Sequence, residues 1–235
     1  MFSYHNDPDT DGVGIAFFDA VAPDGARLDL TVHSPSGWRG PDWDLVEAQL
    51  QVPILNAYQV HGARVLNVGH GDDPAELAVE PADALFSTDR RLGLAVRAAD
   101  CLPVLMADPD HGLIGAAHAG RVGLAAGVLT ALVGQLRAHG ATNVRAWIGP
   151  HICGDCYEVP ADLQQDYCRI LPQARAQTGW GTPSLDLGRA AAAQLTQLGC
   201  QVNRVDPCTR TTPQLHSHRR DGAASGRQAG VIWLP

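Results

Sequence analysis

Three residues whose side chains can bind a metal border apolar segments of the chain. His61 and His118 follow such segments, and Cys101 immediately precedes one. Because loops at strand ends present functional side chains, these three residues are candidates for a single site. Zinc accepts imidazole nitrogen and thiolate sulfur, and three protein ligands leave a fourth position for water or substrate. The alternative is a buried core cysteine with two polar histidines, and the spacing alone leaves both interpretations open.

The charged side chains restrict the chemistry further. All 17 basic residues are arginine, and only four of the 25 acidic residues are glutamate. The absence of lysine excludes a lysine Schiff base, a pyridoxal-phosphate lysine, a P-loop lysine and a kinase-type lysine. Catalysis is therefore expected to use His, Cys or Asp, and an anion must be held by arginine or by a helix end.

Net charge and segment composition limit the partners. The formal net charge of −8 argues against a nucleic-acid partner, because phosphate neutralisation needs a basic surface. Residues 1–11 are polar and acidic, unlike a secretory signal, and no apolar run approaches the roughly 20 residues that span a bilayer. We therefore expect a cytoplasmic protein without a membrane partner, whose six cysteines are reduced. These features leave the oligomeric state open.

Hydrophobic patterning predicts an α/β (α+β) fold. The 235 residues can bury one sizeable core. Strands and helices alternate only partly, so we expect a single layered domain over residues 1–235, with mixed β-sheets flanked by helices. The expected strands are residues 13–18, 27–32, 52–60, 64–68, 92–96, 102–106, 113–117, 144–148, 202–205 and 231–234. The expected helices are residues 43–51, 122–139, 160–170 and 185–198.

Several spaced motifs resemble one family. They are Gln59-Val60-His61-Gly62, Ala99-Asp100-Cys101-Leu102-Pro103, His118-Ala119-Gly120, Ile148-Gly149-Pro150, Cys156-Tyr157-Glu158-Val159, Cys208-Thr209, His218-Arg219-Arg220-Asp221 and Gly226-Arg227-Gln228-Ala229. In this order they resemble the YfiH-like family, also called laccase-domain or multicopper polyphenol oxidoreductase proteins and purine nucleoside phosphorylase-type enzymes. The resemblance is strongest over residues 52–235. It implies a YfiH-like fold and one catalytic zinc ion, bound by the matching residues His61, Cys101 and His118.

The chain departs from the family pattern in two places. Family members usually continue His-Ala-Gly with Trp-Arg-Gly, whereas this chain has Arg121-Val122-Gly123. Residues 1–51 diverge and lack the usual Thr-Arg, Gly-Gly and Asn-Leu segments. The resemblance therefore does not extend to the anion or substrate contacts of those residues, and it supports phosphorolysis less than it supports the metal site.

Two carboxylates join the candidate catalytic residues. Asp83, in Ala82-Asp83-Ala84, also matches a family motif and is expected to orient a ligand of the metal. Asp100 is expected to act in the same way because it adjoins Cys101, with a turn cap as the alternative.

Three further side chains are candidates for binding the substrate or an anion. Arg121 begins the expected helix 122–139, where free N–H groups and the helix dipole favour an anion, and its guanidinium adds a charged fork. Arg97 and His218 are expected to face the same pocket. Solvent-exposed arginines are the alternative for Arg97 and Arg121.

Two other motifs resemble metal-binding patterns. Cys153 and Cys156 form a single C-x-x-C without a second pair, so we expect a structural or pocket-lining role rather than a second metal site. His216 and His218 form a His-x-His pair, which is more typical of a polar loop, although the family motif favours a position in the pocket.

The resemblance implies a purine nucleoside enzyme that uses zinc, with copper as the alternative metal. The expected reactions are phosphorolysis of adenosine, inosine, guanosine or methylthioadenosine, and deamination of adenosine. The expected partners are thus a purine nucleoside and phosphate. A peptidoglycan-precursor editing hydrolase, a copper-dependent polyphenol oxidase and an inactive binding protein remain alternatives. The oxidase is disfavoured because it needs roughly ten metal-binding His, largely in His-x-His pairs, and the chain has one such pair.

Overall fold

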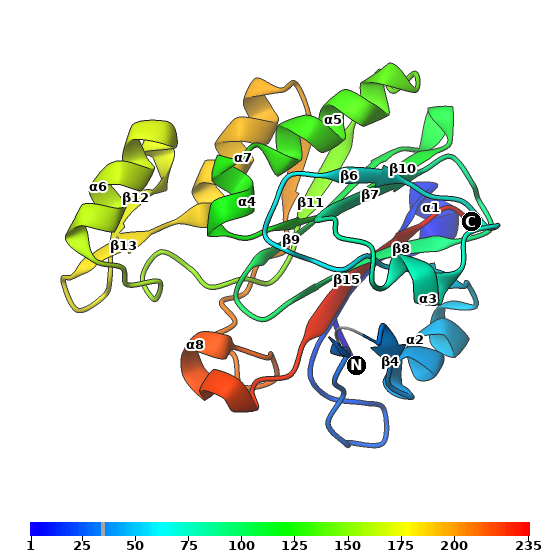
Figure 1. The fold of residues 1–235 in the computed structure, drawn as a ribbon, viewed down its shortest axis with the longest axis horizontal. Helices are drawn as coiled ribbons and strands as arrows, with labels where there is room; N and C mark the ends of the chain where they lie inside the picture. Colours follow the sequence, from blue (N-terminus) through cyan, green and yellow to red (C-terminus); the bar gives the residue numbers. More distant parts are fainter. Residues whose placement is uncertain (34–35) are drawn as a thin grey trace.

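Two β-sheets stacked face to face form the centre of the fold in a computed structural model, which describes residues 1–33 and 36–235 (Figure 1). One sheet has, in spatial order, β1 (Phe2–His5), β2 (Gly14–Phe18), β15 (Gln228–Trp233), β8 (Gly93–Ala98) and β5 (Ile54–Leu55). The other has β14 (Gln201–Arg204), β11 (Arg145–Ile148), β9 (Leu102–Asp108), β10 (Leu113–Ala119), β7 (Ala84–Ser87) and β6 (Val65–Asn67). Two short ribbons pair β12 (Arg175–Gln177) with β13 (Pro183–Leu185) and β3 (Val32–His33) with β4 (Trp38–Arg39).

Eight helices lie around the two sheets and the short ribbons in the part of the chain that the structure describes. They are α1 (Pro8–Asp11), α2 (Asp42–Leu50), α3 (Pro74–Leu77), α4 (Arg121–Ala125), α5 (Val128–Ala138), α6 (Ala161–Ile170), α7 (Leu187–Gln197) and α8 (His218–Asp221). Short 3-10 turns occupy Pro109–His111, Pro172–Ala174 and Gly222–Ala224. Helices α5 and α7 pack on the six-stranded sheet, and α2 packs on the outer face of the five-stranded sheet (Figure 1).

The inner strands of the six-stranded sheet are buried on both faces, which explains their continuous apolar runs. Along β9, Val104 and Met106 face the helices, whereas Leu105 and Ala107 face the second sheet. Successive side chains of a strand point to opposite faces, so a strand covered on both sides must be apolar throughout. The pairs β5–β8, β6–β7 and β11–β14 are parallel and the remaining pairs are antiparallel, which confirms the mixed α/β fold.

The expected elements are largely correct, with four corrections. Only Val32 of the segment 27–32 lies in a strand, β3, because the N–H groups of Leu28 and Leu30 bond to loop carbonyls while their side chains fill the core. Only Ile54–Leu55 of the segment 52–60 is a strand. The expected helix 122–139 is two helices, since Gly127 adopts a left-handed φ of 87° between them.

The fourth correction concerns strands that the patterning missed. Strands β1 and β7 are each four residues long, β12 and β13 are each three residues long, and β4 is two residues long. Runs this short carry little periodic signal. Among the described residues, no helix has the length and apolar character that a membrane crossing requires.

Candidate active site

His118 lies near the end of the central strand β10 and points into the space between the sheets. On this strand Ile114 and Ala116 pack between the sheets, whereas Ala117 and Ala119 pack toward the helices. Strand alternation therefore puts His118 on the side of Ile114 and Ala116. The side chain is buried, with 4% of the residue exposed.

Asp83, which directly precedes β7, holds both histidines of the candidate site. Its carboxylate accepts backbone N–H bonds from Val60, His61 and Gly62 at 3.1, 2.9 and 2.6 Å. It also lies 2.8 Å from Nδ1 of His118. Burial raises the pKa of Asp83, but the hydrogen bonds from His118 and the loop outweigh it and the pKa is lowered overall. Because an ionised carboxylate only accepts, Nδ1 of His118 must carry the proton, and Nε2 is left to bind a metal.

Cys101 lies on the link that carries the chain from β8 of one sheet to β9 of the other. The turn depends on Asp100, whose φ of 90° is in the left-handed region that Asp tolerates better than most residues. The carboxylate of Asp100 accepts bonds from Thr209 Oγ1, Ser217 Oγ and the Arg219 N–H at 2.6, 2.7 and 2.6 Å. Asp100 thus ties three segments together and fixes the position of Cys101.

The side chains of His61, Cys101 and His118 form one group of metal-binding atoms, all within 4.8 Å of one another. Sγ of Cys101 lies 3.8 Å from Nε2 of His61, and the two imidazole rings meet edge to face at 4.8 Å between centroids. Burial, followed by the charge of Asp100, raises the pKa of the Cys101 thiol to about 12. Burial also lowers the pKa of His118, despite its bond to Asp83.

The residues at this position fit a bound metal ion. Two imidazoles and one thiol are ligands that zinc accepts, and the carboxylate bound to His118 is the support that metal-binding histidines usually have. Gly120 keeps the space clear. A Cβ atom there would lie 2.8 Å from Cδ2 of His61 and 3.1 Å from Sγ of Cys101. The donor set therefore suits a three-ligand site with a fourth position open.

A cavity of about 520 Å³ lies beside these three residues. This size is in the range of pockets that bind small molecules. Seven of the candidate site residues line it: His61, Arg97, Asp100, Cys101, His118, Arg121 and His218. Asp83 lies behind the histidines and does not line the cavity. Residues without an assigned role in the sequence also line it, among them Gln59, Tyr157, Arg219 and Arg227.

Arg97 and Arg227 bring two positive charges to the cavity. Arg97 is 8% exposed and donates to the carbonyl of Ala57 at 3.0 Å, beside the side chain of Gln59. Burial, with the nearby charge of Arg227, lowers its pKa to about 10, so Arg97 is charged at neutral pH. Within residues 1–33 and 36–235, neither guanidinium has a carboxylate partner. Two neighbouring guanidiniums without a counter-charge suit an anion. Arg227 belongs to the Gly226-Arg227-Gln228-Ala229 motif, but no role was predicted for it from the sequence.

Arg121 lines the cavity through its side chain. The helix that it begins, α4, is five residues long, so the helix end contributes little to anion binding, contrary to the expectation from a single helix 122–139. Arg121 lies near Tyr157. Burial raises the pKa of Tyr157, although the positive charge of Arg121 acts in the opposite direction.

His216 is a structural residue, which fits the polar-loop interpretation of the His-x-His pair. Its ring is 2% exposed and lies within bonding distance of the Leu28 carbonyl on one side and the Arg27 guanidinium on the other. Its neighbour His218 begins α8 and lines the cavity.

The chain is similar in sequence and in fold to known proteins. Residues 42–235 match the family described as multi-copper polyphenol oxidoreductase laccase. The chain is 46% identical over 181 residues to a purine nucleoside phosphorylase of Streptomyces coelicolor, covering 75% of this chain and 73% of that protein. It is 43% identical over 218 residues to a purine nucleoside phosphorylase of Mycobacterium bovis, covering 92% and 80%. The crystal structure of YfiH from Bacillus licheniformis, a hypothetical protein, has a TM-score of 0.83 at 28% identity, covering 96% and 94%.

The fold and the matched sequence define a mixed α/β protein of the YfiH type. The chain belongs to the laccase-domain (YfiH) family, whose description names copper. In the part of the chain that the structure describes, the candidate metal-binding groups contain three residues each. This is far short of the roughly ten His that a multicopper oxidase needs.

Proposed function

We propose that the protein is a zinc-dependent purine nucleoside phosphorylase. One observation carries this proposal. The His61, Cys101 and His118 donors line one cavity of nucleoside size together with Arg97 and Arg227, whose guanidiniums bond to uncharged groups and have no carboxylate partner among the described residues. The first set fits a metal and the second fits phosphate. The names of the Streptomyces and Mycobacterium relatives support the same reaction.

The reaction requires the chain to hold two reactants in line. An oxygen of phosphate bonds to the anomeric carbon of ribose, the bond to the purine nitrogen breaks, and the departing purine takes up one proton. We assign phosphate to Arg97 and Arg227, whose positive charges favour the dianion. The zinc ion, when bound, supplies a Lewis acid beside the substrate.

Two other residues of the cavity lining suit the base. Tyr157 and Arg219 both line the cavity, and the guanidinium of Arg219 lies over the Tyr157 ring at 5.2 Å from the centroid. An aromatic ring and a planar guanidinium offer flat surfaces to a purine. His218 lines the cavity and is not one of the three metal donors, so we assign it the proton that the leaving purine needs.

Adenosine deamination is a second candidate, since a metal site with an open fourth position can activate water. The two reactions differ in their products. Adenosine is incubated with the zinc-loaded protein, with and without phosphate, and the products are separated by chromatography. Phosphorolysis yields adenine only when phosphate is present, whereas deamination yields inosine without phosphate. If the zinc-loaded protein forms neither product, or if Cys101→Ala retains full activity, the proposal is wrong.

A further inference from the structure

Three cysteine thiols form a second group, outside the donors already described. The Sγ atoms of Cys153, Cys156 and Cys208 lie within 4.8 Å of one another. The first two come from the loop that follows β11, and the third comes from the loop that follows β14. We propose that this three-thiol cluster binds a second zinc ion. The sequence offered only a single C-x-x-C, and the fold supplies a third thiol.

Backbone hydrogen bonds hold the thiols of the cluster together. The carbonyl of Cys153 accepts the N–H groups of Cys156 and Tyr157, both at 3.0 Å, so the C-x-x-C is a tight turn. The N–H of Cys153 donates to Sγ of Cys208 at 3.4 Å. The adjacent segments also pair, because the N–H of Thr209 donates to the carbonyl of His151 at 3.0 Å. N–H groups directed at sulfur stabilise a thiolate that binds a metal.

Burial and charge at the cluster also suit an ion. Cys156 is buried, whereas Cys153 and Cys208 are half-buried, so an ion can reach the thiols from solvent. Three thiolates with one zinc ion carry a net negative charge. The positively charged guanidinium of Arg210, which lies over the ring of Trp180 at 4.9 Å, also interacts with Cys156 and offsets that charge. The site thus has a compensating cation.

The number of thiols favours a metal over other sulfur chemistry. A disulfide would join two of the three cysteines and leave the third thiol without a bonding partner, whereas one metal ion can bind all three. An iron–sulfur cluster usually requires four cysteines. Soft thiolate ligands select zinc and Cu(I), and zinc commonly accepts cysteine-rich sites with C-x-x-C spacing.

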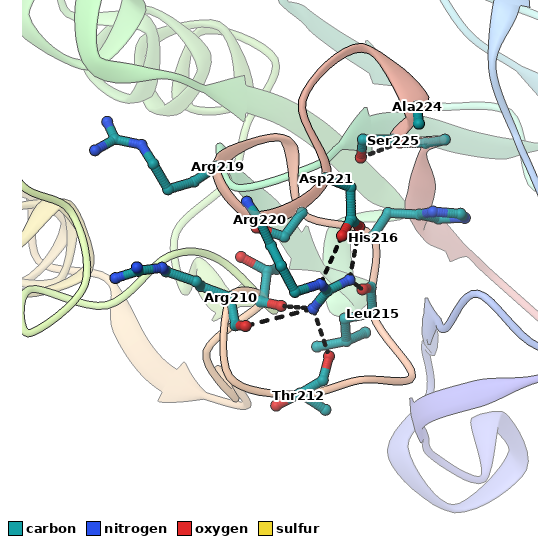
Figure 2. Close-up of polar contacts among 12 residues, drawn as sticks. Arg210, Thr212, Leu215, His216, Arg219, Arg220, Asp221, Ala224 and Ser225 are labelled. Carbon is teal, nitrogen blue, oxygen red and sulfur yellow. Dashed lines mark hydrogen bonds and ion pairs between the residues drawn. The ribbon is translucent and has the colours of Figure 1, made fainter.

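The cluster also joins two walls of the active-site cavity. Ile152 and Tyr157, on either side of the C-x-x-C, line the cavity. Thr209, which follows Cys208, donates to Asp100. Figure 2 shows how Arg220 holds the rest of this segment, since its guanidinium donates to the carbonyls of residues 209, 210, 212 and 215 and to the carboxylate of residue 221. A zinc ion at the cluster would fasten the loop after β11 to this segment.

The test is the zinc stoichiometry of the full-length protein. Zinc is removed with a chelator, restored by titration and counted by elemental analysis after dialysis. We expect about two equivalents in the wild type and about one in Cys208→Ser, which retains the first site. Cys200→Ser removes a buried thiol outside both groups and serves as the matched control, with about two equivalents expected.

A second variant keeps the test decisive if Cys208→Ser does not fold. Cys101→Ala disrupts only the first site, so it should still bind about one equivalent, held by three thiolates. Cobalt in place of zinc should then give a strong thiolate-to-metal absorption band in this variant. The proposal is overturned if folded Cys208→Ser binds as much zinc as the wild type, if folded Cys101→Ala binds none, if the metal bound by Cys101→Ala is copper, or if mass spectrometry finds a disulfide within the cluster. A single wild-type equivalent that Cys208→Ser loses would instead contradict the metal site of the proposed function.

Discussion

Oδ1 of Asp83 lies 2.8 Å from Nδ1 of His118, and both side chains are buried. The same carboxylate accepts three backbone N–H groups from the loop that carries His61. One residue therefore sets both the tautomer of one candidate metal donor and the backbone position of another. Asp83 thus acts on the candidate site although it does not line the cavity.

Asp83→Asn should weaken zinc binding at the first site by about 10- to 100-fold, because the amide cannot accept from all four donors and does not fix the His118 tautomer. Zinc affinity is measured by competition with a chelator. Asp108→Asn is the matched control, since Asp108 is also buried and accepts N–H bonds from Thr142 and Asn143 beside His111. Equal losses in both variants would mean that Asp83 acts only through the fold.

Gly120→Ala should displace the metal donors, since its Cβ would lie 2.8 Å from His61 and 3.1 Å from the Cys101 sulfur. We expect the variant to lose most of its first-site zinc and activity while its circular dichroism spectrum stays native. Gly134→Ala, in helix α5, meets no atom within 4 Å and should keep full zinc content. It should also gain up to about 1 kcal/mol of stability from helix propensity. Normal zinc binding by Gly120→Ala would contradict the description of a tight donor set.

Arg227→Gln should raise the KM for phosphate by about 10-fold or more, because charge-assisted bonds to an anion contribute about 1.5–3 kcal/mol. The KM for the nucleoside should change by less than about twofold. Both constants come from initial rates with one reactant saturating. Arg91→Gln, which alters an exposed arginine paired with Asp89, is the control and should leave both constants unchanged. A larger effect on the nucleoside KM than on the phosphate KM would contradict the assignment of phosphate to Arg227.

Acidification should destabilise the fold partly through His216. Burial lowers the pKa of His216 despite its bond to the Leu28 carbonyl, so the unfolded state binds a proton more readily than the folded state. The resulting stability is present above the unfolded value of about 6.5 and is lost as the pH falls through the lower folded pKa. His216→Gln should therefore be less stable than the wild type at pH 7, with a gap that narrows toward pH 5. Urea unfolding of chelator-treated protein at several pH values checks this, and a gap that widens on acidification would refute it.

The sequence predicted best those strands and helices whose formation depends on one local feature, such as a continuous apolar run or a proline at a helix start. The apolar runs of β9 and β10 are continuous because both faces of their sheet are covered, and α6 follows Pro160. Segment 27–32 misled the prediction because Leu28 and Leu30 alternate as in a strand but bond to loops. The break at Gly127 depends on one backbone angle, which a helical pattern of side chains does not reveal.

The site divides in a similar way. The motif order led to His61, Cys101, His118 and Asp83 because each is local to a strand end. Arg227 and Cys208 were not assigned, since they meet the other candidate residues only where loops distant in sequence come together. Pairwise proximity between such loops depends on sheet order, and a single sequence does not encode that order in any local pattern.

The most direct test of the central claim is the release of adenine from adenosine in the presence of phosphate, measured together with zinc content. The comparison uses the wild type, Cys101→Ala and the control Cys200→Ser. We predict phosphate-dependent adenine release by the wild type and by Cys200→Ser, and at least about a 100-fold loss in Cys101→Ala, which lacks first-site zinc. Phosphate-dependent release by Cys101→Ala at the wild-type rate would contradict a catalytic metal site formed by His61, Cys101 and His118.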